Sequence, residues 1–154
     1  MGEGVGDSDW HGRAGELYRT WRAEGILQQE EAPAYYALKQ RYKLPTGQVK
    51  ELIGVIGACA LAPFGEGGVL PHEHTFSKPK EDRFKLMQTT QANISQIYGF
   101  FSDPDMTVDQ ALVEASTRAP VIEVTDDEGN LHQMWPILDT DICKKIAETL
   151  GNRP

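Results

Sequence analysis

Two turn signals, each placed between segments that suit β-strands, constrain the fold of this chain more than any other feature. Residues 45–47, Pro-Thr-Gly, have tight-turn chemistry, and so does the acidic stretch 126–130, Asp-Asp-Glu-Gly-Asn. The segments beside them are rich in apolar, β-branched and aromatic residues: 34–42, 52–63, 120–125 and 131–138. We therefore expect two antiparallel hairpins, the first with a largely buried second strand. A buried helix is the alternative for 52–63, where Gly54 and Gly57 favour the strand.

Apolar residues recur at helical spacing in four further segments. Gly25 is placed to end the first helix, Pro79 lies in the first turn of the second, and Thr107 with Gln110 has the capping-box arrangement at the start of the third. A short strand is expected at 97–101. The expected inner faces are Trp10, Ala14, Leu17, Tyr18 and Trp21; Leu86, Met87, Thr90 and Ile94; Val108, Ala111, Leu112 and Ala115; and Ile142, Ile146 and Leu150.

The order of these elements predicts the fold class. Helix, hairpin, helix, strand, helix, hairpin and helix follow one another without a repeat or a linker. This order is typical of an α+β fold, a largely antiparallel sheet with flanking helices. We expect a single domain over residues 9–154, preceded by a disordered N-terminus at residues 1–8.

Composition excludes several classes of function. The 154 residues carry a formal net charge of −8, whereas binding to nucleic acid phosphates needs clustered Lys and Arg. No apolar stretch approaches the ~20 residues of a membrane-spanning helix, and residues 1–7 lack the features of a secretion signal. Cys59 and Cys143 form no disulfide or metal motif, so we expect buried thiols. We expect a cytoplasmic protein that acts on a small molecule, without nucleic acid or membrane as a partner.

Ionisable and amide side chains are concentrated in the stretch 70–99, which reads as a loop and the helix after it. Glycines at 65, 67 and 68 let the preceding backbone approach a ligand closely, and Pro71 restricts Leu70 to extended conformations. The candidate functional residues of this stretch are His72, Glu73, His74, Thr75, Lys80, Asp82, Arg83 and Asn93.

Three interpretations of this stretch remain open from the residues alone. His72 and His74 could reach one metal ion from the same face of a strand, but no third ligand has an obvious place. Glu73 could act as a general base or a magnesium-coordinating carboxylate while Lys80 and Arg83 hold an anionic group. The charged residues could instead be only the solvated start of a helix, where ion pairs contribute about 0–1 kcal/mol.

The same stretch resembles the domain-of-unknown-function family 1015. The resemblance rests on Leu70-Pro71-His72-Glu73-x-Thr75, Lys80-x-Asp82-Arg83, Leu86, Ala92-Asn93 and Ser95-x-Ile97, and on Trp21-x-x-Glu24-Gly25-Ile26-Leu27 with Ala32-Pro33-Ala34-Tyr35-Tyr36. It extends from about residue 10 to residue 154. Members of this family are longer than this chain and resemble the ParB and sulfiredoxin group, including its free-serine kinases.

The resemblance implies phosphoryl transfer to or from a small hydroxy amino acid such as serine, with Mg²⁺ and ATP or ADP. It implies Glu73 and His72 as catalytic residues, and His74, Thr75, Lys80, Asp82, Arg83 and Asn93 as substrate- or phosphate-binding residues. No residue here matches the family's later Asp-Gly-His-His-Arg motif, so we expect an internal fragment that is inactive alone. A non-catalytic binding or regulatory module, and a metal-dependent hydrolase using His72 and His74, are the alternatives.

Overall fold

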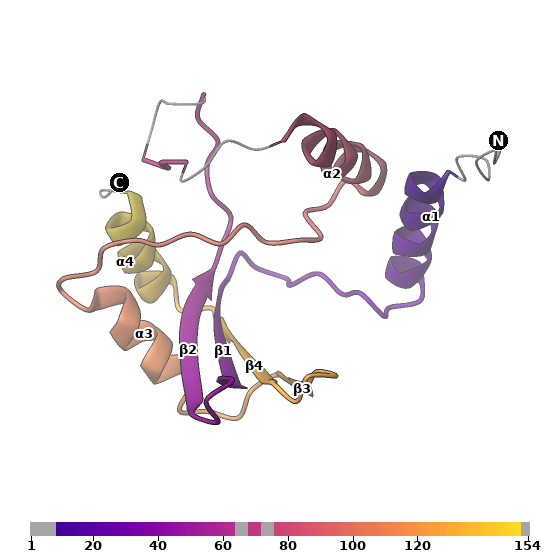
Figure 1. Cartoon of the computed structure of the whole chain (residues 1–154). Helices are drawn as coiled ribbons and strands as arrows, with labels where there is room; N and C mark the ends of the chain where they lie inside the picture. The colour runs from indigo at the N-terminus through magenta and orange to yellow at the C-terminus, as the bar shows by residue number, and fades with distance from the viewer. Residues whose placement is uncertain (1–8, 64–67, 72–75, 152–154) are drawn as a thin grey trace. The chain divides into compact units, whose positions relative to one another are not determined.

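The computed structural model of the chain describes residues 9–63, 68–71 and 76–151 (Figure 1). These residues form four helices and a four-stranded antiparallel sheet, so the predicted single α+β domain is confirmed. Two compact units can be distinguished within it. The helix unit comprises Met1–Gln29 and Pro71–Tyr98, and the sheet unit comprises Glu30–Leu70 and Gly99–Pro154.

The sheet unit is built on the two predicted hairpins. Strands β1 (Tyr35–Lys43) and β2 (Val49–Ile56) form the first, and β3 (Ile122–Thr125) and β4 (Leu131–Ile137) form the second. The hairpins join through antiparallel pairing of β1 with β4, which gives the order β2-β1-β4-β3. Gly47 and Gly129 have φ values of 85° and 83° in the two turns, a region that favours glycine.

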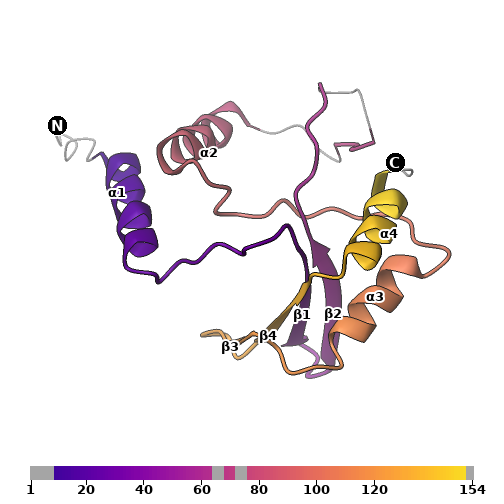
Figure 2. The ribbon, with the colours of Figure 1, turned by 180° about the vertical axis from the view of Figure 1, so that it is seen from behind.

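Helices α3 (Thr107–Ala115) and α4 (Thr140–Gly151) lie on the same face of this sheet (Figures 1 and 2). The predicted inner faces of both helices are confirmed, because Val108, Leu112, Ala115 and Ile146 are all buried. They pack with three residues of the sheet, Ala37, Trp135 and Ile137. The indole nitrogen of Trp135 donates a hydrogen bond to the carbonyl oxygen of Arg118 at 2.8 Å, so this core leaves the indole donor satisfied.

Three sequence predictions for the sheet unit were wrong in detail. Strand β2 begins earlier than expected and ends at Ile56, and its first half is exposed rather than buried. Residues 97–101 form no strand. Helix α3 is capped by Asp103 rather than Thr107, because the Asp103 carboxylate accepts hydrogen bonds from the backbone amides of residues 107, 108 and 109 at 2.8–3.0 Å.

The helix unit pairs α1 (Trp10–Ala23) with α2 (Ser77–Thr90). The Asp9 carboxylate caps α1 by accepting a hydrogen bond from the Gly12 amide at 2.9 Å. The predicted inner face of α1 was wrong in part: Trp10, Leu17 and Trp21 are exposed and Ala14 and Tyr18 are half-buried, while Gly15, which was not predicted, is buried. Gly15 has no side chain, so the backbones of α1 and α2 can approach closely there, and the face of α1 that carries Gly15 packs against α2.

Helix α2 is shorter than the apolar pattern predicted. It ends at Thr90, so Ile94, expected on its inner face, lies beyond the helix and is exposed. Thr90 is buried, as expected, and its hydroxyl donates to the Leu86 carbonyl oxygen at 2.9 Å. Gln91 then takes a left-handed conformation with φ 54°. Its backbone N–H donates a hydrogen bond to the Met87 carbonyl oxygen, which closes the helix.

Candidate functional site

Helix α2 carries three of the sequence-predicted site residues, Lys80, Asp82 and Arg83, and the structure places them on two faces. Asp82 faces α1, where its carboxylate Oδ1 accepts a hydrogen bond from His11 Nε2 at 3.1 Å. The same imidazole nitrogen lies 3.3 Å from the Asp82 carbonyl oxygen, so both contacts require the proton on Nε2. Asp82 is therefore engaged in joining the two helices.

The packing of α1 on α2 explains how His11 reaches Asp82. One turn after His11, Gly15 lies against Thr89, and a β-carbon added to Gly15 would lie 2.6 Å from Thr89 Cγ2. Thr89 is held by its own hydrogen bond, since its hydroxyl donates to the Lys85 carbonyl oxygen at 2.8 Å. The glycine thus brings the α1 backbone close enough for the short His11 side chain to contact α2.

Lys80 and Arg83 lie on a different face of α2 from Asp82. They are three positions apart, a spacing that brings two side chains to one side of a helix, and both are exposed. Within the described residues neither of them forms an ion pair. This two-residue cationic face lies in the first two turns of α2, and Phe76 provides no side-chain cap for that helix end. Its charge is available to an anion.

The remaining candidates are not brought into this cluster by the described residues. Asn93 follows the end of α2 and is exposed, away from the first turns where Lys80 lies. His72, Glu73, His74 and Thr75 lie outside the described residues, although the chain places them directly before α2. Their predicted roles stay predictions.

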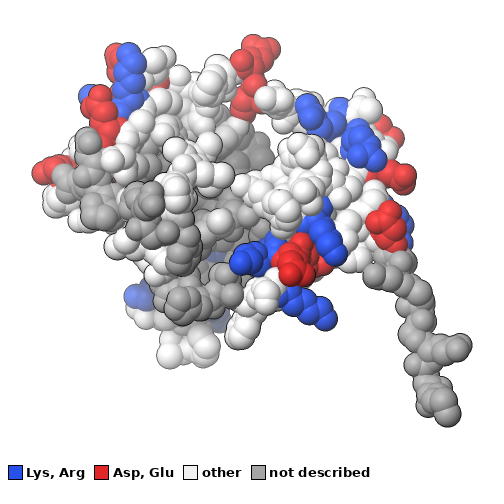
Figure 3. Space-filling model, turned by 90° about the horizontal axis from the view of Figure 1, so that it is seen from above, with Lys and Arg blue, Asp and Glu red and all other residues white. Residues whose placement is uncertain are grey.

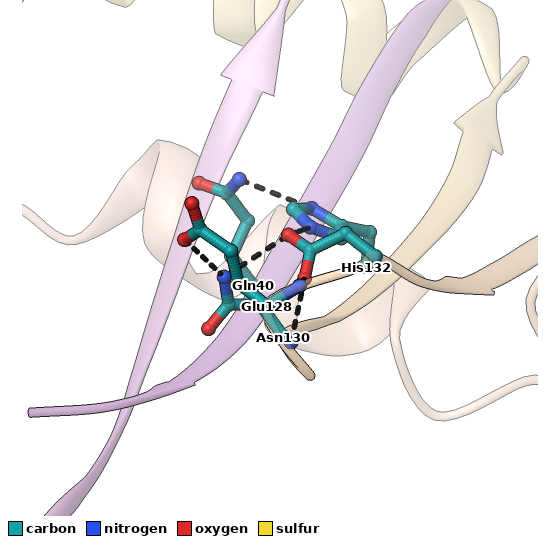
Figure 4. A network of polar contacts seen from close by, with 5 residues as sticks. Gln40, Glu128, Asn130 and His132 are labelled. Carbon is teal, nitrogen blue, oxygen red and sulfur yellow. Dashed lines mark hydrogen bonds and ion pairs between the residues drawn. The ribbon is translucent and has the colours of Figure 1, made fainter.

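A second polar cluster, which the sequence analysis did not single out, lies on the sheet (Figure 4). His132 of β4 donates from Nε2 to Asp126 Oδ2 at 2.9 Å and accepts at Nδ1 from the Gln40 amide of β1 at 3.1 Å. Asp126 also accepts from the backbone amides of Glu128 and Asn130 and from the Asn130 side chain, at 2.8–3.0 Å.

These hydrogen bonds lower the pKa of the Asp126 carboxyl group. The bonds from His132 and then Asn130 hold the pKa of Asp126 well below its usual range, because they stabilise the ionised carboxylate. The contacts of Asp126 with Glu128 and Asn130 lie within the turn, and its contact with His132 ties the turn to β4, while Gln40 joins β1 to β4. We therefore assign the cluster a structural role, that of fixing the register of the β3–β4 hairpin.

Charges of both signs are mixed on the face seen in Figure 3. Among the described residues drawn there, Lys and Arg side chains lie beside Asp and Glu side chains and form no continuous basic patch. Phosphate backbones of nucleic acids require such a patch. The cationic face of Lys80 and Arg83 comprises only these two side chains.

Among the described residues, no group of three or more His, Cys, Asp or Glu side chains could hold a metal ion. Cys59 is exposed, so its predicted burial was wrong, and Cys143 is half-buried with its thiol donating to the Ile137 carbonyl oxygen at 3.2 Å.

Comparison with known proteins adds one finding. A family model described as a protein of unknown function (DUF1015) matches residues 2–154. The chain belongs to the DUF1015 family. No curated protein and no solved structure matches it. The DUF1015 match covers every candidate residue named above, including those outside the described part, and confirms the family predicted from the sequence. None of the described helices is long and apolar enough to cross a membrane.

Proposed function

We propose that this chain binds a phosphate-bearing small molecule at the start of α2 and serves in nucleotide-dependent phosphoryl transfer to or from a small hydroxy amino acid such as serine. The observation that carries the proposal is the cationic face of Lys80 and Arg83. Both side chains are exposed, share one side of the helix and lack an ion-pair partner among the described residues.

The chemistry of the two cations suits a phosphate. An Arg guanidinium presents paired N–H donors that match two phosphate oxygens, while a Lys ammonium supplies a compact charge beside them. The positive end of the helix dipole adds to this attraction in the first turns of α2. Exposed ion pairs elsewhere, such as Arg41 with Glu51, show the alternative arrangement, in which the cation is already neutralised.

Glu73 supplies the base in the proposed reaction, as the resemblance to free-serine kinases implies. It accepts the proton of the serine hydroxyl while that oxygen forms a bond to the terminal phosphorus of the nucleotide. The bond from that phosphorus to the bridging oxygen breaks, and the shortened nucleotide leaves with the bond's electron pair. The nucleotide enters as its magnesium complex, so the ion arrives with the substrate. Nucleotide and free serine meet in the cytoplasm, and the proposal places the reaction there.

A non-catalytic ligand-binding module is the second candidate, and the position of Asp82 favours it. Of the described site residues on α2, Asp82 is bound to His11 and leaves only two cations facing outward. Two cations are sufficient to hold an anion, whereas catalysis also needs the carboxylate of Glu73. The two functions therefore differ in whether ligand binding survives the loss of that carboxylate.

Phosphoserine formation separates these candidates. A longer protein that contains this chain would be incubated with L-serine, Mg²⁺ and either ATP or ADP, and products would be measured by mass spectrometry beside its Glu73→Gln variant. Product that disappears in Glu73→Gln supports the kinase. Nucleotide binding without product, unchanged in Glu73→Gln, supports the binding module. Absence of both product and nucleotide binding contradicts the proposed function.

A further inference from the structure

An open cleft lies at the C-terminal ends of α1 and α2, within the helix unit, and has a volume of about 340 Å³. It is lined by Tyr18, Arg22, Leu27, Gln28, Gln29 and Gln91. Its volume is at the lower end of the range for small-molecule sites. Gln91 and Lys80 lie about 16 Å apart along the axis of α2, so this cleft is separate from the cationic face.

Among the described residues that line the cleft, one has a charged side chain, and it is a cation. Arg22 is in the last turn of α1 and forms no ion pair with any described residue. No described Asp or Glu residue lines the cleft. A ligand that completes this site therefore brings a carboxylate or another small anionic group to the guanidinium.

Two side-chain amides of the lining each keep an oxygen atom that can accept a hydrogen bond. Gln28 donates from Nε2 to the Gly25 carbonyl oxygen at 3.2 Å, and Gln91 donates from Nε2 to the Gln88 carbonyl oxygen at 2.7 Å. Each bond uses the donor end of an amide, so each Oε1 remains an acceptor. The C-terminal ends of two helices also carry partial negative charge. These groups favour a cationic part of the ligand beside the anionic part.

The backbone of Gln91 is a separate observation at the same place. Its φ of 54° lies in the left-handed region, where a side chain is disfavoured and where Gly or Asn usually closes a helix. Strained backbone of this kind collects at functional sites. The Gln91 side chain is thus kept at a position where glycine would fit the backbone better, and it lines the cleft.

We propose that this cleft binds a free α-amino acid with a neutral side chain. Arg22 holds the carboxylate of the amino acid, and the side-chain Oε1 atoms of Gln28 and Gln91 accept hydrogen bonds from its ammonium group. Tyr18 and Leu27 contact its side chain. A zwitterion fits because the cleft offers one cation and neutral acceptors. The proposal is independent of the phosphoryl transfer proposed above.

Nuclear magnetic resonance titration of the ¹⁵N-labelled chain tests this proposal. The probes are L-alanine, L-serine, L-leucine and L-glutamine, together with propionate and ethylamine, which each keep one end of alanine. Concentrations reach about 10 mM, enough to saturate a site with a Kd of about 1 mM. We expect at least one amino acid to shift the amide signals around Arg22 and Gln91. Propionate and ethylamine are each expected to bind at least about tenfold more weakly than that amino acid.

Three variants locate the site. Arg22→Gln is expected to weaken binding about tenfold or more, since it removes the charge-assisted bonds to the carboxylate. Gln91→Gly removes an acceptor while keeping a residue that suits the backbone, so weaker binding there cannot be due to unfolding. Arg19→Gln is the matched control, because it removes an exposed Arg of the same helix that does not line the cleft.

Several results would overturn the proposal. These are no response of the cleft signals to any amino acid, propionate bound as tightly as alanine, or equal loss of binding in Arg19→Gln and Arg22→Gln. Nucleotide is absent from these titrations and Lys80 is unchanged in them. Failure here is therefore distinct from failure of the proposed phosphoryl transfer.

Discussion

Replacing Gly15 by Ala tests whether α1 and α2 are packed as closely as the structure indicates. In an exposed helix interior this change stabilises by up to about 1 kcal/mol, because Ala has the higher helix propensity. At Gly15 the added β-carbon would lie 2.6 Å from Thr89 Cγ2 and 3.0 Å from the Thr89 carbonyl oxygen. Carbon atoms in contact prefer about 3.5–4.0 Å, so either the Thr89 side chain must change or the helices must move apart.

The two effects have opposite signs, and the steric one is expected to be larger. Overpacking of this kind costs about 1–3 kcal/mol. A new Thr89 rotamer could relieve the methyl contact only by breaking the hydroxyl bond to Lys85, and it would leave the contact with the carbonyl oxygen. We expect a net loss of about 1 kcal/mol for Gly15→Ala, from the difference between overpacking and propensity.

Hydrogen exchange of the α1 and α2 amides measures this change where it occurs. A loss of 1 kcal/mol corresponds to roughly fivefold faster exchange in the helix unit. Gly151→Ala in α4 is the control, because nothing lies within 4 Å of its added β-carbon. Thr89→Ser should restore part of the loss in the double variant. Slower exchange in Gly15→Ala would refute the close packing of the two helices.

Three further variants probe the sheet unit. Asp103→Ala removes the acceptor for three amides at the start of α3 and is expected to cost about 1–2 kcal/mol in urea denaturation, whereas no change would contradict the assigned cap. Ile146→Ala opens the core beneath α4 and is expected to cost about 2–5 kcal/mol, with a matching fall in Tm; a loss below about 1 kcal/mol would contradict its full burial. Because the pKa of folded Asp126 is lowered, its stabilisation is present above the ordinary carboxyl pKa and is lost as pH falls below it, so Asp126→Asn should flatten the acid limb of a stability–pH profile. An unchanged acid limb would contradict that origin.

Much of the fold follows from local sequence signals. The two hairpins were predictable because turn residues and strand-forming segments are adjacent in the chain. The inner faces of α3 and α4 were predictable because apolar residues recur at helical spacing within each amphipathic segment. Val108 and Leu112 belong to this pattern in α3, and Ile146 belongs to it in α4. In both cases the local pattern and the tertiary packing agree.

The errors arose where tertiary contacts decide the outcome. Residues 97–101 have strand-forming composition, but a strand needs a hydrogen-bonded neighbour, and Ile97 is 91% exposed in the structure. The aromatic spacing of α1 suggested an inner face at Trp10 and Trp21, whereas close helix packing selected Gly15. A hydropathy pattern does not register a preference for small residues at a helix contact.

The candidate site shows the same division. Helical spacing alone puts Lys80 and Arg83 on one face of α2, so the cationic face could be predicted from the sequence. The pairing of Asp82 with His11 joins residues 71 positions apart, and no local signal indicates it. The left-handed backbone of Gln91 was also hidden, because Gln has no special preference for that conformation.

Binding of magnesium ATP to the cationic face tests the central claim most directly. The ¹⁵N-labelled chain would be titrated with nucleotide, and the α2 amide signals would be followed in Lys80→Gln, Arg83→Gln and Lys85→Gln. Lys85 is an exposed cation on another face of the same helix, so its variant controls for total charge. The account predicts that the first two variants each weaken binding about tenfold while the control changes it little. Equal weakening in all three, or no shift of α2 signals in the parent chain, would contradict it.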